Sequence, residues 1–117
     1  MKNFLRLFLF FVTGLSPSFA YDMSGHDLFS QLKDYYIEKG MTDQQLLNAG
    51  RAYGYVCAIY DSNREEITIP EGTKPTHLIA AVYKFLLDNP NLRYKKANTL
   101  VLEAFSQGYP LQGNELL

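Results

Sequence analysis

The side chains in this chain most able to do chemistry are one cysteine and two histidines. Cys57 could serve as a thiol nucleophile with His77 as its base, and together with His26 these residues could be considered as zinc ligands. Cys57, however, lies between Val56 and Ala58 on an apolar stretch, where a small buried residue is the commoner interpretation. The three residues lack the local spacing of a metal site, so zinc is only weakly supported.

The acidic residues offer no better catalytic arrangement. Glu65 and Glu66 are adjacent in a segment that we expect to be a loop, so their carboxylates would point in different directions and mainly keep it solvated. The sequence contains no glycine-rich phosphate loop and no Gly-x-Ser-x-Gly elbow. We therefore expect a protein that is not an enzyme and that uses no metal and no cofactor.

The first 20 residues have the organisation of an export signal. Two basic residues precede an apolar run from Leu7 to Val12, and small residues lead up to Ala20. We expect cleavage after Ala20, which makes residues 1–20 a signal peptide and residues 21–117 one mature domain. The apolar run is too short to favour a membrane span, and no later stretch approaches the roughly 20 residues that a span needs.

Net charge and cysteine content further limit the kinds of partner and of stabilising interaction that this protein can have. Cleavage would remove two of the eleven basic residues and none of the twelve acidic ones, so the remaining 97 residues carry a net charge near −3. The absence of a basic stripe argues against nucleic-acid binding, and nine tyrosines suit a protein partner better. With a single cysteine no intramolecular disulfide can form, so apolar burial must stabilise the domain, and self-association would help.

Hydrophobic periodicity predicts an all-α fold, a small bundle of about four antiparallel helices. Ser24 with Asp27 and Thr42 with Gln45 have the spacing of capping boxes, and Gly40 is expected to end the first helix as a left-handed cap. The expected helices cover residues 25–39, 43–61, 75–88 and 95–107, with a loop over residues 61–74.

The second expected helix carries an apolar face with two glycines in it. The glycines, Gly50 and Gly54, would allow a neighbouring helix to approach closely on that face. The full predicted buried face is Leu46, Ala49, Gly50, Tyr53, Gly54, Cys57 and Tyr60.

Three segments form an ordered pattern that resembles the Rap/Tai family of type VI secretion immunity proteins. They are YGYVCAIYD at residues 53–61, ITIPEGTKPTHLIAAVYKFLLDNP at residues 67–90, and ANTLVLEAFSQGYP at residues 97–110. The resemblance covers about residues 24–111. It implies a compact helical fold, a periplasmic location, and a role in binding and blocking a peptidoglycan-cleaving amidase injected by another cell. It also implies that members can form homodimers.

The chain departs from this family in its cysteines. The resemblance implies paired cysteines at places that hold Gln31 or Leu32, Ala52, Thr68 and Leu111 here, and Cys57 matches none of them. A glutamine that the family has early in the third helix is His77 in this sequence. We interpret the chain as a diverged member without the usual disulfides.

The partner-binding surface is expected on the turns between helices, because the resemblance implies that loops and helix ends contact the toxin. Tyr94 and Arg93 are the candidate anchors, since tyrosine and arginine dominate interfaces. The alternative is that Tyr94 simply packs against the third helix and that Arg93 is solvated. The first predicted set is Asn89, Asn91, Leu92, Arg93 and Tyr94, and the second is Arg64, Glu65 and Glu66.

One alternative function remains open at this point. A periplasmic helical chaperone or structural protein of the acid-stress kind would share the size, location and aromatic content. It would bind many unfolded proteins after acidification, whereas an immunity protein would bind one amidase tightly.

Overall fold

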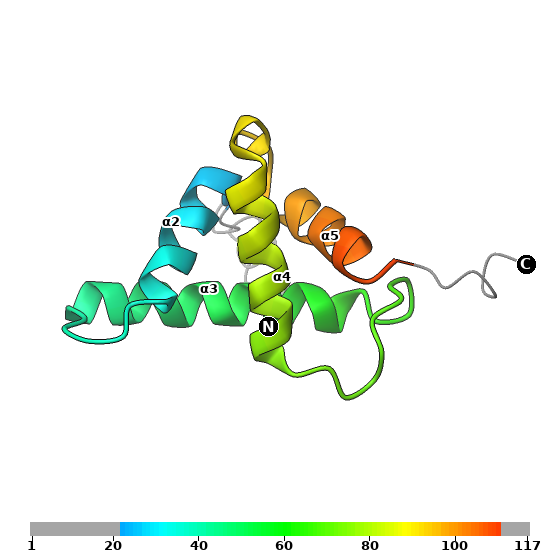
Figure 1. Ribbon diagram of the computed structural model, residues 1–117, viewed down its shortest axis with the longest axis horizontal. Helices are drawn as coiled ribbons and strands as arrows, with labels where there is room; N and C mark the ends of the chain where they lie inside the picture. Colours follow the sequence, from blue (N-terminus) through cyan, green and yellow to red (C-terminus); the bar gives the residue numbers. More distant parts are fainter. Residues whose placement is uncertain (1–21, 111–117) are drawn as a thin grey trace, which may run out of the picture.

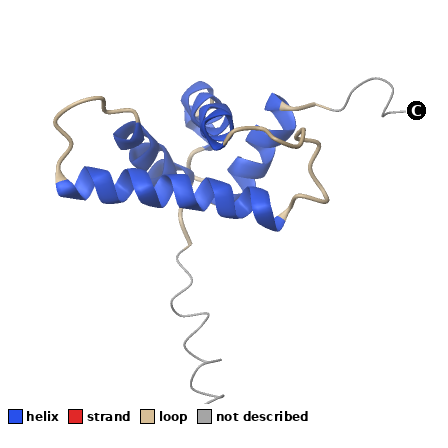
Figure 2. Cartoon of the chain, turned by 90° about the horizontal axis from the view of Figure 1, so that it is seen from below, coloured by secondary structure: helices blue, strands red, loops and turns tan. Residues whose placement is uncertain are grey.

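The computed structural model describes residues 22–110, and the predicted signal peptide at residues 1–20 lies outside them. Within the described residues the chain is all-α, as predicted, with four α-helices and one short 3₁₀ turn (Figure 1). These elements are α2 (Gly25–Tyr35), α3 (Asp43–Ser62), α4 (Pro75–Asp88), η1 (Pro90–Leu92) and α5 (Ala97–Gly108). The long helix α3 forms one layer, and the other three helices lie on one side of it (Figure 2).

Both predicted capping boxes are present. The Ser24 hydroxyl accepts a hydrogen bond from the Asp27 amide at 3.1 Å, and the Asp27 carboxylate accepts one from the Ser24 amide at 3.3 Å. Thr42 and Gln45 repeat the arrangement at the start of α3, at 3.1 and 2.9 Å. Each box satisfies amide groups that a helix start otherwise leaves without acceptors, so these two starts are locally encoded.

The end of α2 was predicted wrongly. The helix ends at Tyr35, four residues before Lys39, and Gly40 lies in the connecting loop with φ +76° instead of capping the helix. The amides of Tyr36 and Ile37 donate to carbonyls three residues back, those of Lys33 and Asp34, at 3.2 and 3.1 Å. This tightening of the last turn ends the helix before the glycine is reached.

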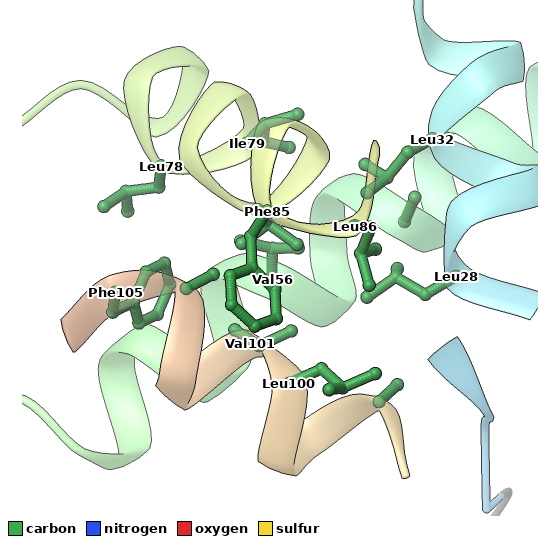
Figure 3. Close-up of a cluster of buried hydrophobic side chains, with 14 of the residues drawn as sticks. Leu28, Leu32, Val56, Leu78, Ile79, Phe85, Leu86, Leu100, Val101 and Phe105 are labelled. Atoms are coloured by element: carbon green, nitrogen blue, oxygen red, sulfur yellow. The ribbon is translucent and has the colours of Figure 1, made fainter. Parts of the chain in front are cut away.

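All four helices contribute side chains to one hydrophobic core (Figure 3). Helix α3 contributes Ala52 and Val56, both fully buried. The larger core residues in Figure 3 are Leu28 and Leu32 of α2, Leu78, Ile79, Phe85 and Leu86 of α4, and Leu100, Val101 and Phe105 of α5.

The predicted buried face of α3 was largely wrong. Its inward face is formed by Ala49, Ala52 and Val56, whereas the predicted Leu46 and Tyr53 are 62% and 39% exposed. A Cβ at either Gly50 or Gly54 would meet nothing within 4 Å, so no described helix approaches these glycines. Because three helices pack on one side of α3 only, the apolar stripe that contains the glycines faces outward.

The places where the family resemblance implies cysteines hold other interactions here. Leu32 and Ala52 both belong to the buried core. Thr68 donates a hydrogen bond from its hydroxyl to the Tyr109 carbonyl at 2.7 Å, which ties the loop before α4 to the end of α5. Leu111 lies outside the described residues. Packing and one hydrogen bond therefore hold segments together at positions where disulfides were implied.

Gly25 and the glycines of α3 provide a matched stability test. A Cβ at Gly25 would lie 2.7 Å from the Arg93 carbonyl oxygen and would also collide with the Leu100 side chain. We expect Gly25→Ala to lower the free energy of unfolding by about 1–3 kcal/mol through overpacking. Gly50→Ala, in open space on a helix, should raise it by about 0.5–1 kcal/mol. Urea denaturation measures both, and an unchanged Gly25→Ala variant would contradict the close approach.

Candidate functional site

The first predicted binding set forms one turn at the end of α4, residues 89–94, which we call the tip (Figure 1). It includes the 3₁₀ turn η1 and leads into α5. Tyr94 is 71% exposed and Asn91 is also exposed, whereas Leu92 packs partly against the core. The tip therefore carries both outward side chains and side chains that fix its own shape.

Two tip side chains cap the end of α4. Asn89 donates from Nδ2 to the Phe85 carbonyl at 2.8 Å. Arg93 donates from Nε to the Leu86 carbonyl at 2.7 Å and, more weakly, from Nη2 to the Leu87 carbonyl at 3.4 Å. These carbonyls belong to the last turn of α4 and have no partner within the helix. A cation at this position also interacts favourably with the negative end of the helix dipole.

The backbone that leaves the tip caps the start of α2. The Gly25 amide donates to the Lys95 carbonyl, and the His26 amide donates to the Arg93 carbonyl, both at 2.8 Å. The Ala97 amide donates in the opposite direction, to the Met23 carbonyl, again at 2.8 Å. Residues 23–26 thus run beside residues 93–97, and the closeness of the two segments is the reason that position 25 has no room for a side chain.

Arg93 also connects the tip to a row of aromatic rings. Its guanidinium lies over the Phe29 ring, 3.6 Å from the ring centroid, which is cation–π geometry. From Phe29 the ring contacts continue to Tyr83, Tyr36, Tyr35 and Tyr53, with successive centroids 5.6, 4.8, 5.1 and 6.4 Å apart. We call these five residues the aromatic row, and it joins α2, α3 and α4.

The aromatic row is a candidate interface that sequence reasoning did not select. Tyr36 and Tyr53 remain 43% and 39% exposed, and tyrosine is enriched at interfaces. Burial, with smaller contributions from Tyr35 and Tyr83, raises the pKa of the Tyr36 hydroxyl above its ordinary value. The adjacent tyrosines at positions 35 and 36 were the available signal, but only the fold brings Tyr53 and Tyr83 beside them.

The second predicted binding set lies directly after the end of α3. Arg64, Glu65 and Glu66 line an open hollow of about 570 Å³ in the loop that precedes α4. This loop leads from α3 to the start of α4, whereas the tip follows the other end of α4. Arg64 lies 4.0 Å from Glu71 in an exposed ion pair, which contributes little to rigidity. The structure therefore brings the eight predicted residues into two separate groups.

The side chains considered for catalysis do not form a reactive arrangement. Burial, and to a smaller extent Asp61, raises the pKa of the half-buried Cys57 thiol, which reduces the thiolate fraction at neutral pH. Both histidines lie on exposed first turns of helices. Within residues 22–110 no group of three or more histidine, cysteine, aspartate or glutamate residues could hold a metal ion. None of the helices in that range has the length and apolar character of a membrane span.

Comparison with known proteins identifies the family to which this fold is similar. A family model described as Rap1a immunity proteins matches residues 24–111, which include all four helices and the tip. A search of curated proteins found no match. The match agrees with the resemblance seen in the three sequence segments.

Proposed function

Because the chain belongs to the Rap1a immunity protein family, we propose that it binds and occludes a type VI secreted peptidoglycan amidase. The family match over residues 24–111 is the observation that carries the proposal, since it implies an immunity protein for a secreted effector. The amidase as target rests on the sequence resemblance. Blocking such an enzyme requires only a shape that fills its cleft.

The arrangement of side chains supports binding rather than catalysis. The Cys57 thiol has a raised pKa and lies between Val56 and Ala58 on α3. It is therefore poorly suited to attack a substrate. The tip, in contrast, combines a braced backbone with an exposed tyrosine. A rigid surface with an aromatic anchor is what tight protein recognition requires.

The proposal places the protein in the periplasm, where the peptidoglycan substrate of an amidase lies. The export signal expected at residues 1–20 supports this location. With cleavage after Ala20, the mature chain would begin two residues before the buried Met23, close to the start of the folded domain.

Co-expression tests the proposed function directly. Cells that export an amidase encoded beside this gene should lyse, and export of this chain should prevent the lysis. A variant without residues 2–20 is the matched control, because it should fold but remain in the cytoplasm and give no protection. Lysis that continues despite periplasmic accumulation of the intact chain would refute the proposal.

The proposal includes self-association, for which the outer face of α3 is the best suited described surface. Leu46 and Leu47 are exposed there, and beside them lies a mainly apolar groove of about 650 Å³. The groove is lined by Met23, Gly50, Arg51, Gly54 and Tyr55. An equivalent face of a second copy could bury Leu46 and Leu47.

Sedimentation velocity at micromolar concentration checks this interface. We expect a dimer for the wild-type chain and a monomer for Leu46→Glu, because a charge would be buried between the two helices. Leu87→Glu, at an exposed leucine on α4, is the control and should remain dimeric. A wild-type chain that sediments only as a monomer would refute the proposed self-association.

A further inference from the structure

We infer that the tip contacts the effector through Tyr94, and that Arg93 is a positioning residue that holds Tyr94 in its outward orientation without touching the effector itself. This inference rests on the proposed function. It assigns different roles to Arg93 and Tyr94, which the sequence analysis had treated as equal anchors. Its basis is the opposite environment of two adjacent side chains.

The side chain of Arg93 is directed into the molecule. Its Nε donates to the Leu86 carbonyl at 2.7 Å, its Nη2 reaches the Leu87 carbonyl, and the guanidinium plane covers Phe29 at 3.6 Å. An effector would have to break these contacts before it could recruit the same guanidinium. Because hydrogen bonds from a charged donor are among the stronger ones in proteins, that exchange would be unfavourable.

Tyr94 has the opposite environment. It is the most exposed of the large hydrophobic residues in residues 22–110, at 71%, and none of the ring contacts found in that range involves it. Its backbone neighbours on both sides are fixed, since the Arg93 and Lys95 carbonyls accept the first two amides of α2. The structure therefore presents a free tyrosyl ring on a backbone that has little freedom to move.

This combination favours affinity for a physical reason. Binding usually costs free energy because loops and side chains must be ordered at the interface, and a turn that is already ordered avoids much of that cost. The loop of the second set is also restrained, since Asn63 donates from Nδ2 to the Ile59 carbonyl at 2.8 Å. Its arginine is held less closely, because Arg64 lies 4.0 Å from Glu71 in an exposed ion pair and 5.7 Å from the Tyr60 ring. Arg93 is therefore the better positioned of the two arginines.

Calorimetric titration of the purified mature chain with the amidase encoded beside its gene tests the inference. Tyr94→Ala should weaken binding about 30-fold, as expected when a central tyrosine anchor is lost. Arg93→Lys keeps the charge but loses the planar group that stacks on Phe29 and donates to two carbonyls, and it should weaken binding by about 2-fold to 10-fold. Lys74→Arg, a charge-preserving exchange at an exposed position outside both predicted binding sets, is the control and should bind like the wild type.

The double variant separates positioning from direct contact. If Arg93 acts through Tyr94, Arg93→Lys should add almost nothing to the loss already caused by Tyr94→Ala. Phe29→Leu, which removes the ring beneath the guanidinium, should behave like Arg93→Lys in both backgrounds. Thermal melts of each variant verify that the chain is folded at the titration temperature.

Three results would overturn the inference. Wild-type affinity in Tyr94→Ala would show that the effector does not use the tip anchor, while leaving the proposed function intact. An Arg93→Lys loss that is undiminished in the Tyr94→Ala background would assign Arg93 a contact of its own. A wild-type chain that binds no amidase would instead refute the proposed function, and the inference would fail with it.

Discussion

The backbone of Arg93 accepts a hydrogen bond from the first turn of α2, while its guanidinium donates to the last turn of α4. One residue thus satisfies groups at two helix ends that would otherwise need water or other partners. The same guanidinium stacks on Phe29, so the capped helix end is also connected to the aromatic row. The contacts of this residue therefore link α2, α4 and the tip.

The junction at Arg93 matters because the domain has no covalent cross-link to hold its elements together. Apolar packing on one side of α3 supplies most of the cohesion. Packing alone would leave the turns free to move. Side-chain hydrogen bonds from Asn89, Arg93 and Thr68 restrain the turns, which are the parts that a partner-binding protein must present in a fixed shape.

Sequence reasoning predicted the fold where the signals were local and missed features that depend on long-range packing. The capping boxes at Ser24 and Thr42 and the proline at the start of α4 determine helix starts within a few residues, so those boundaries were predicted correctly. The face of α3 was largely mispredicted because its outer stripe is as apolar as its inner one, and only the crossing helices decide between them.

In the candidate site, too, local features could be predicted from the sequence and long-range contacts could not. The tip residues could be chosen from the sequence as a turn between two helices, but the inward direction of Arg93 could not, because its acceptors and Phe29 are brought near it by the fold. The aromatic row likewise joins residues from three helices that are distant in sequence. Pairwise contacts of this kind have no periodic signature, so composition could indicate only that tyrosines were abundant.

Amide hydrogen exchange followed by NMR, with Arg93→Ala compared to the wild type, tests the central role of this junction most directly. In the wild type the Gly25 and His26 amides should be protected, although amides in the first turn of a helix usually exchange fast. In Arg93→Ala these two amides should exchange much faster, whereas the Val56 amide in the centre of α3 should change little. Equal acceleration at all three positions, or no acceleration at Gly25 and His26, would contradict the account.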